Sequence, residues 1–200
     1  MLMQHIETAR AEDDIITDLA FTGEQLTGAD LSRLHLHRVS FSKCRFTKCD
    51  FTATRFLSVT FKNCDFANCS FSDSFWKQST IDDCKGNGAD LSQSTCKEMT
   101  LQSSCFDYAN FSKSQWDSAV ISGCSFKESF WSEVRFKKLR LEKAVFSGAD
   151  FFKTSLKDVD LSDCKIDGIM VSETFKELRG AKINFVQCSE IARLLGIKII

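Results

Sequence analysis

Large apolar residues recur at every fifth position of this chain, from Phe21 to Val171. Of the 31 positions in this series, 29 are large and apolar, and Gly86 and Cys96 are the two exceptions. An α-helix read in steps of five would spread these residues around its axis, and a β-strand would place every second one in water. The pattern therefore predicts a coil whose inward position recurs every fifth residue, which is a repeat solenoid.

The position two residues before each inward residue is usually small, and it predicts a second, tighter interior slot. Seven of the ten cysteines occupy it: Cys44, Cys49, Cys64, Cys69, Cys84, Cys124 and Cys164. Because a free cysteine behaves as a small hydrophobe, we expect these thiols to fill the slot without forming disulfides. The five-residue spacing of Cys44 and Cys49 is not typical of zinc ligands, so neither a metal nor a cofactor is expected.

Four segments, Ala29-Asp30-Leu31, Ala89-Asp90-Leu91, Ala109-Asn110-Phe111 and Ala149-Asp150-Phe151, resemble the repeat of the pentapeptide-repeat family. The resemblance implies an all-β solenoid, a right-handed quadrilateral β-helix with four repeats per coil. About eight coils at the usual strand spacing give a rod of roughly 35–40 Å. We expect residues 1–20 to form an N-terminal cap and residues 21–175 the β-helix. Residues 176–200 would then form a C-terminal cap with a short helix over 187–195, a tail and a dimerisation role.

Twenty residues per coil place every fourth repeat on the same face, so charge can be compared between faces. The face around Leu31, here called the acidic face, carries seven acidic and three basic residues, a net charge of −4. The neighbouring face around Leu36, here called the basic face, carries eight basic and three acidic residues, a net charge of +5. The candidate partner-binding residues on the acidic face are Asp30, Asp50, Asp73, Asp90, Glu133 and Asp150.

A purely structural interpretation of several of these carboxylates stays open. An Asp or Asn directly before the inward residue can bond the turn backbone, which applies to Asp30, Asp50, Asp90 and Asp150. His35 and His37 flank Leu36 and are interpreted as solvated side chains. The sequence contains no paired carboxylates, catalytic triad or phosphate-binding loop, so we expect that the protein is not an enzyme.

The formal net charge is −1, and no apolar run approaches the length of a membrane span. The first ten residues lack the basic start and apolar core of a signal peptide. We therefore expect a cytoplasmic protein with no direct nucleic-acid partner and no membrane partner.

Two local features lead to further expectations. Gly86 stands at an inward position but has no side chain, whereas Phe66 and Phe106, 20 positions before and after it, are large. We therefore expect the backbone to leave the regular coil at residues 85–88. Exposed apolar residues near the C-terminal end predict a two-fold homodimer. The candidate interface consists of Phe130, Phe152, Met170, Ile191, Leu194, Leu195, Ile197 and Ile199.

The C-terminal stretch from Leu178 to Lys182 and from Ile191 to Ile197 is similar to the ending of the Qnr proteins, which are pentapeptide-repeat proteins that protect bacterial DNA gyrase from quinolones. The segments Phe21–Glu24, Cys84–Leu91 and Tyr108–Lys113 are also similar to Qnr sequences. This resemblance implies DNA gyrase or topoisomerase IV as partner, bound through a surface that imitates DNA. The alternative is an interaction scaffold of the same fold for an unrelated macromolecule.

Overall fold

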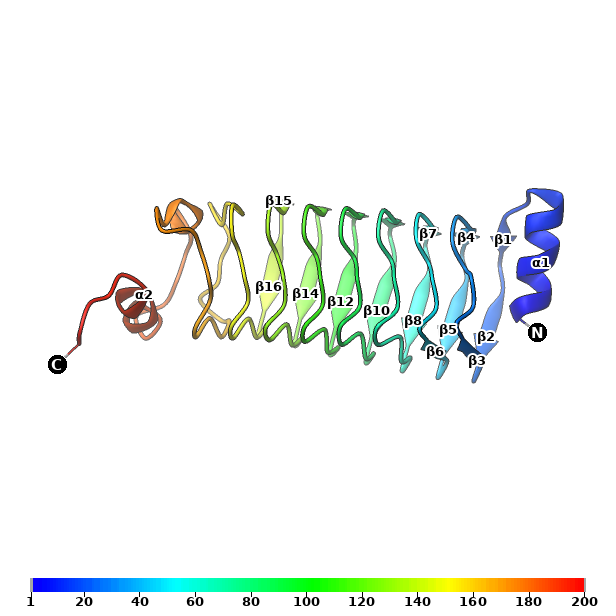
Figure 1. The fold of residues 1–200 in the computed structure, drawn as a ribbon, viewed down its shortest axis with the longest axis horizontal. Helices are drawn as coiled ribbons and strands as arrows, with labels where there is room; N and C mark the ends of the chain where they lie inside the picture. Colours follow the sequence, from blue (N-terminus) through cyan, green and yellow to red (C-terminus); the bar gives the residue numbers. More distant parts are fainter. Residues whose placement is uncertain (1, 200) are drawn as a thin grey trace.

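The computed structural model describes residues 2–199, which form one elongated β-solenoid (Figure 1). Its coils stack between an N-terminal helix, α1 (Leu2–Glu12), and a C-terminal helix, α2 (Cys188–Leu194). A 3-10 turn, η1 (Lys176–Leu178), precedes α2. The all-β solenoid with a short C-terminal helix, predicted from the five-residue period and the family resemblance, is confirmed.

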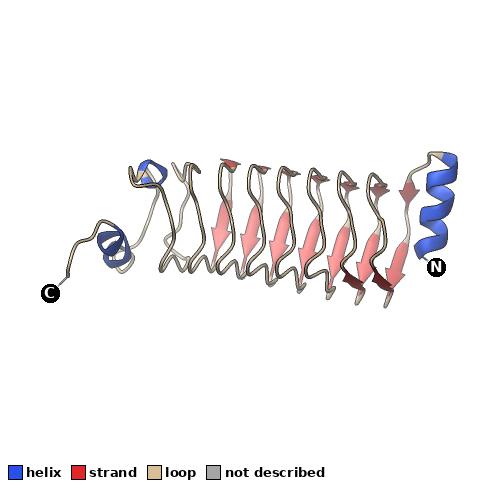
Figure 2. Cartoon of the chain, in the orientation of Figure 1, coloured by secondary structure: helices blue, strands red, loops and turns tan. Residues whose placement is uncertain are grey.

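Short parallel strands run across the long axis of the solenoid and form three sheets that extend along it (Figure 2). The first sheet contains β1 (Ile16–Thr17), β4 (His35–His37), β7 (Arg55–Leu57), β9 (Phe75–Lys77), β11 (Thr95–Lys97), β13 (Gln115–Asp117) and β15 (Arg135–Lys137). The second contains β2 (Ala20–Thr22), β5 (Ser40–Ser42), β8 (Thr60–Lys62), β10 (Thr80–Asp82), β12 (Thr100–Gln102), β14 (Val120–Ser122) and β16 (Arg140–Glu142). The third pairs β3 (Gln25–Thr27) with β6 (Arg45–Thr47).

Strand partners are 20 residues apart, so each inward residue stacks on its counterpart in the next coil. Ile16 faces Leu36 at the start of the first sheet, and Trp116 faces Phe136 at its end. The outward side of this sheet is the basic face. The acidic face is joined by isolated bridges instead of strands, for example between Asp30 and Asp50.

The number of strand-forming coils is smaller than predicted. Seven stacked strands in the first sheet make six turns from β1 to β15, compared with the eight coils expected from the sequence. Further along, isolated bridges such as Asp150 with Met170 join the coils on two faces. The difference arises because the coil after β15 and β16 is not paired with them.

Aromatic rings at inward positions 20 residues apart stack on one another and form the core. We call each such column of inward side chains a ladder. The ring centroids of Phe51 and Phe71 are 4.6 Å apart, and those of Phe56 and Trp76 are 3.7 Å apart. These side chains are at most 1% exposed. Burying one such side chain stabilises the fold by about 1.5–3 kcal/mol, so the ladders provide most of the stability.

The corner residue, two positions after each inward residue, has a left-handed backbone. At Lys43 and Asn63, for example, φ is 54°. A non-glycine residue with positive φ is uncommon because its Cβ crowds the backbone. Here the neighbouring coil holds the conformation, since the backbone N–H of Lys43 donates to the carbonyl oxygen of Lys62 at 2.9 Å.

At Gly86 the prediction of an irregular backbone was wrong. Lys85 forms regular bridges to both neighbouring coils, and the Gly86 N–H donates to the Cys105 carbonyl at 2.7 Å. The rings of Phe66 and Phe106 lean into the free space, with centroids 6.0 Å apart and planes tilted by 46°. A Cβ on Gly86 would lie 2.5 Å from Phe106 Cε1. The missing side chain is therefore compensated by its neighbours and not by the backbone.

Both ends of the solenoid are covered. Leu2, Ile6 and Ala9 of α1 are buried over the first coil, so the N-terminal segment ends the core with an apolar helix face. At the other end the Gln187 side-chain amide is buried and donates to the carbonyl oxygens of Leu161 and Cys164, at 2.8 and 2.6 Å. These contacts satisfy backbone groups that a further coil would otherwise bond.

All ten cysteines are free thiols, and the seven predicted to fill the interior slot are buried, which confirms that prediction. Burial raises the pKa of the Cys69 and Cys96 thiols to about 12. Within residues 2–199, no group of histidine, cysteine and carboxylate side chains is arranged to hold a metal ion. The helices in this part of the chain are too short and too polar to cross a membrane.

Candidate interaction surface

Four of the predicted carboxylates, Asp30, Asp50, Asp90 and Asp150, lie in one column along the acidic face, set by parallel bridges. Each accepts a hydrogen bond of 2.8–2.9 Å from the backbone N–H two residues later. This geometry stabilises the turn, so these side chains have the structural role that the sequence left open. Asn110 bonds the Ser112 N–H in the same way at 3.0 Å, which shows that an amide can replace the carboxylate.

Asp73 and Glu133 lie in a second column, at the corners of their coils, where φ is 56° and 60°. Both side chains are exposed. Among residues 2–199, neither carboxylate has a hydrogen-bond or ion-pair partner. Of the six predicted partner-binding residues, these two have no role in the turns.

The acidic residues gather in the N-terminal half of the acidic face. Asp50, Asp73 and Asp90 lie on three consecutive coils, so the outer two are about 10 Å apart along the rod. We call these three residues the carboxylate cluster. Further along this column, Asn110, Phe130 and Met170 leave Asp150 as an isolated carboxylate. The negative charge is therefore densest in the N-terminal half of the acidic face.

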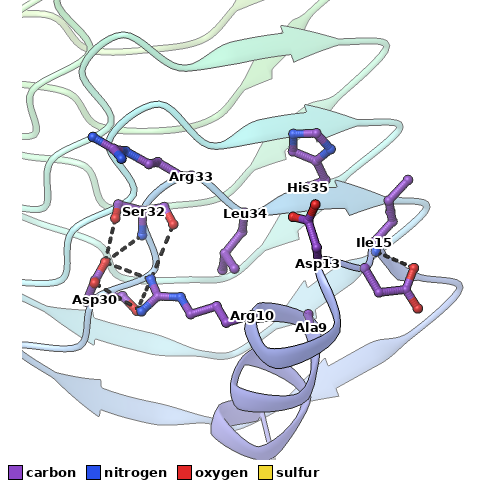
Figure 3. Close-up of a pocket in the computed structure, with 10 residues that line it drawn as sticks. Ala9, Arg10, Asp13, Ile15, Asp30, Ser32, Arg33, Leu34 and His35 are labelled. Carbon is purple, nitrogen blue, oxygen red and sulfur yellow. Dashed lines mark hydrogen bonds and ion pairs between the residues drawn. The ribbon is translucent and has the colours of Figure 1, made fainter.

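Asp30 is set apart from this cluster because Arg10 of α1 binds it (Figure 3). The Arg10 guanidinium donates to Asp30 Oδ2 at 3.0 Å and to the carbonyl oxygens of Asp30 and Ser32 at 3.1 and 3.3 Å. The hydrogen bond from Arg10, with a second from Ser32, holds the pKa of Asp30 well below its usual range. This contact attaches the N-terminal helix to the first coil.

The hollow beside Arg10 has a volume of about 730 Å³ and a mixed lining. Acidic side chains of Asp13 and Asp14 and basic side chains of Arg33 and His35 line it together (Figure 3). His35 is exposed, and the other predicted solvated histidine, His37, lies 3.2 Å from an Arg38 nitrogen.

An apolar patch replaces the negative charge toward the C-terminal end of the acidic face. Phe130, Phe152 and Met170 are 46%, 42% and 48% exposed, as predicted from their outward positions. Parallel bridges place Asp150 between Phe130 and Met170. The Lys153 ammonium lies 5.0 Å from the centre of the Phe152 ring.

The predicted residues of the C-terminal segment divide into two groups. Ile191 and Leu194 pack partly buried against the core, whereas Leu195, Ile197 and Ile199 are at least half exposed. Phe185 and Val186 are 91% and 78% exposed, and the sequence prediction missed them because they lie beyond Val171, where the apolar five-residue series ends. In the sequence, they could have been recognised as two adjacent apolar residues directly before the polar start of a helix.

The basic face carries both paired and unpaired cations. Arg38 pairs with Asp18, and Lys137 pairs with Asp117 at 2.7 Å. The hydrogen bonds from Lys137 and Ser118 lower the pKa of Asp117. Arg55 and Lys97 lie over the ring of Phe75, 5.3 and 5.8 Å from its centre. The surface of the rod thus presents charged side chains and exposed apolar side chains, and both kinds can bind another macromolecule.

Comparison with known proteins is consistent with this geometry. The profile of the pentapeptide repeat region matches residues 14–85 and 54–131, and the profile of eight pentapeptide repeats matches residues 132–168. No curated protein sequence matches the chain significantly.

Comparison with solved structures gives matches at low sequence identity. A trypsin-treated variant of QnrB1, a plasmid-mediated fluoroquinolone resistance protein, is 20% identical, with 90% of this chain and 99% of that chain covered and a TM-score of 0.58. A second trypsin-treated QnrB1 variant is 18% identical, with 93% and 99% covered and a TM-score of 0.49. HetL from the cyanobacterium Nostoc sp., a pentapeptide repeat protein involved in heterocyst differentiation regulation, is 14% identical, with 88% and 92% covered and a TM-score of 0.33.

Proposed function

The chain belongs to the pentapeptide-repeat family, and from this premise we propose that it binds bacterial DNA gyrase or topoisomerase IV through its acidic face and modulates the action of quinolones. The observation that carries the proposal is the carboxylate cluster of Asp50, Asp73 and Asp90 on a rigid rod. Its column spacing is fixed by parallel bridges between the coils. QnrB1, which shares the fold over nearly the whole of its own chain, is a fluoroquinolone resistance protein, and this supports a role in quinolone action.

Rigid presentation is the physical reason that a modest charge suffices. A partner that meets a preformed column loses little conformational entropy on binding, because the coils are already ordered. A DNA-binding surface of a topoisomerase is positively charged, and the cluster offers negative charge at a fixed spacing to it. In this proposal the protein acts by binding the topoisomerase and not as an enzyme.

We further propose that two copies join through their C-terminal ends. Phe185 and Val186, together with Leu195, Ile197 and Ile199, expose apolar side chains there, and such patches mark contacts between proteins. Two rods joined end to end would be about 75 Å long, the length of roughly 22 base pairs of DNA. The carboxylate clusters of the two copies would lie on the outer arms of this rod.

A second candidate function is an interaction scaffold for an unrelated macromolecule. The observation that favours it is the position of Asp30, Asp50, Asp90 and Asp150, since all four bond their own turns. If these residues serve only the fold, the acidic face lacks most of its binding charge.

Binding and supercoiling assays distinguish the two functions. We expect the wild-type protein to bind gyrase or topoisomerase IV at low salt and to restore part of the supercoiling activity in the presence of ciprofloxacin. The triple variant Asp50→Asn, Asp73→Asn, Asp90→Asn should bind about tenfold more weakly, given roughly 0.5 kcal/mol for each exposed charge pair. It should fold normally, because Asn110 already makes the same turn with an amide.

The matched control removes three exposed charges elsewhere, by Asp83→Asn, Glu128→Gln and Asp158→Asn. This control should bind as the wild type does. Equal binding by the carboxylate-cluster variant and the wild type would show that the acidic face is structural. Absence of wild-type binding to either topoisomerase at low salt would favour the scaffold.

A further inference from the structure

The wall of the solenoid is open at one place, between the coil of β15 and β16 and the coil that follows. Among residues 2–199, no backbone hydrogen bond or bridge joins residues 135–142 to residues 155–162. We call this gap the seam. Figure 2 shows the strand arrows of both large sheets ending at its N-terminal side.

The two coils that precede the seam show, on the same faces, which bonds are missing. There the Arg135 N–H donates to the Ser114 carbonyl at 3.0 Å, and the Ser118 N–H donates to the Lys137 carbonyl at 2.9 Å. The equivalent donors at the seam, the N–H groups of Ser155 and Lys138, have no such partner in the described chain. Both lips of the seam therefore present unpaired backbone groups.

The seam is closed on the other two faces and at both of its corners. The Lys165 N–H bonds the Ala144 carbonyl at 2.9 Å, so the coils stay joined on the side away from the seam. At one corner Thr154 Oγ1 accepts from the Val134 N–H at 2.8 Å. At the other corner Asp163 Oδ2 accepts from the Lys143 N–H at 3.2 Å. The opening is thus a wedge with a hinge along its back.

On its other side, the coil that forms the C-terminal lip is bonded to the terminal segment. The N–H groups of Leu156, Asp158 and Leu161 donate to the carbonyl oxygens of Glu177, Gly180 and Lys182 at 2.8, 3.0 and 2.8 Å. This coil belongs to the C-terminal cap, which explains why its N-terminal edge can stay unpaired without the end of the rod unfolding.

Solvent reaches the core at the N-terminal lip of the seam, whereas Leu156 and Leu161 on the C-terminal lip are each 1% exposed. Phe136 and Leu141 are only partly buried, whereas their ladder neighbours Trp116 and Ile121 are 1% and 0% exposed. A hollow of about 590 Å³ lies over Phe136. Its lining consists of Glu133, Val134, Arg135, Phe136, Lys153, Ser155 and Lys157. The seam is therefore a groove with an aromatic floor and a net positive rim.

We propose that the seam binds an extended acidic peptide segment of a protein partner by strand addition to β15. An unpaired strand edge is a template for another strand, whose main chain supplies the hydrogen bonds that the edge lacks. β15 has its side chains outward, inward and outward at Arg135, Phe136 and Lys137. A strand with the pattern acidic, apolar, acidic would place its carboxylates beside Arg135 and Lys157 and its apolar side chain on Phe136.

Backbone chemistry favours a peptide over a nucleic acid in this groove. Phosphate groups could pair with Arg135, Lys153 and Lys157, but a nucleic acid has no alternating donors and acceptors at the spacing of a strand. Insertion of a strand needs the lips about two strand spacings apart, roughly 10 Å. This widening breaks the two corner bonds, Val134 to Thr154 and Lys143 to Asp163, while the bond from Lys165 to Ala144 on the closed side keeps the coils joined.

The test uses a synthetic peptide of sequence Glu-Val-Glu-Val-Glu, blocked at both ends, and the full chain. Without peptide, the amides of Phe136, Lys138 and Leu141 should exchange with solvent far faster than those of Trp116, Ser118 and Ile121. Saturating peptide should slow the exchange of the first group at least tenfold. A peptide in which Lys replaces each Glu, and single-stranded DNA of equal charge, should not slow it.

Charge variants distinguish strand addition from simple attraction. Replacing Arg135 and Lys157 by Ala should weaken peptide binding by about fivefold, at roughly 0.5 kcal/mol for each pair. The control replaces Lys77 and Lys97 by Ala on the same face, where β9 and β11 are paired on both edges, and should bind like the wild type.

Three results would overturn the proposal. They are slow exchange of the Phe136, Lys138 and Leu141 amides before any peptide is added, peptide binding that leaves their exchange unchanged, and absence of peptide binding. Protection by the DNA that equals protection by the acidic peptide would assign the groove to phosphate.

Discussion

The indole N–H of Trp131 donates a hydrogen bond to the hydroxyl oxygen of Ser129, 2.8 Å away, inside the core. The hydroxyl group in turn donates to the Phe126 carbonyl at 2.6 Å. Trp76 and Trp116 bond Ser74 and Ser114 in the same way, at 2.7 and 2.9 Å. Each tryptophan in this solenoid therefore has a serine two residues before it, in the interior slot that cysteine or alanine fills elsewhere.

This relationship predicts that Ser129→Ala lowers the free energy of unfolding by about 1–3 kcal/mol, because it leaves a buried indole N–H without an acceptor. Chemical denaturation measures the change. The control is Ser94→Ala, in the same slot of a coil whose inward residue is Cys96 and not Trp. A loss at Ser94 as large as that at Ser129 would show that the slot, and not the indole bond, sets the cost.

Gly86→Ala should be destabilising even though the backbone there is regular. Its Cβ would lie 2.5 Å from Phe106 Cε1 and 2.8 Å from Phe66 Cε2, so the rings must move. Overpacking of this kind costs about 1–3 kcal/mol. The thermal unfolding midpoint of the variant should fall accordingly.

A double variant checks the origin of this cost. Phe106→Leu removes part of the ring that meets the new methyl group, so the cost of Gly86→Ala should be smaller in that background. Additive losses in the double variant would mean that the methyl group is tolerated and that the effect has another cause.

Thiol labelling should separate one cysteine from the rest. Cys188 is exposed and Cys105 is partly buried, whereas the other eight are buried. Burial raises the pKa of the Cys124 and Cys164 thiols to about 11, so they hold little of the reactive thiolate near neutral pH. Mass spectrometry of the native protein should show fast alkylation at Cys188, slow alkylation at Cys105 and all ten sites only after denaturation.

The raised thiol pKa values also predict a loss of stability in alkaline solution. Above the ordinary thiol pKa of 9.0 the unfolded chain loses protons that Cys69 and Cys96 keep in the fold, up to about pH 12. The unfolded state then binds fewer protons, so the free energy of unfolding decreases as the pH rises through this window. Denaturation at pH 8 and pH 10 measures the decrease, and Cys96→Ala should reduce its slope.

The fold was predictable because one physical requirement, burial of a large side chain at every fifth residue, is visible in the sequence. Phe51, Phe71 and Leu91, which are buried in three consecutive coils, show this requirement directly. The compensation at Gly86 was not predictable, because it depends on how far the Phe66 and Phe106 rings tilt in three dimensions. Helix α1 was not predictable, since Leu2, Ile6 and Ala9 give a short, weak period.

The surfaces were predictable only in part. Outward positions such as Asp73 and Phe130 follow directly from the register. The binding of Asp30 by Arg10 did not, because it depends on where the cap docks. The seam could not be predicted, since Phe136 and Leu141 are large apolar residues like their paired counterparts Trp116 and Ile121.

The last prediction concerns the proposed dimer and its C-terminal contact. Truncation after Gly180 would also remove Gln187, which bonds the carbonyl oxygens of Leu161 and Cys164, so the end of the solenoid would lose its cap. Point variants avoid this problem. Phe185→Ser with Val186→Ser changes two side chains that are 91% and 78% exposed, so the fold should be unaffected while sedimentation shifts from dimer to monomer. The control is Tyr108→Ser, an aromatic residue that is 64% exposed in the middle of the rod, and it should leave the dimer intact. A dimer that persists in the double variant would contradict a contact through these side chains, and a wild-type protein that sediments as a monomer would contradict the dimer itself.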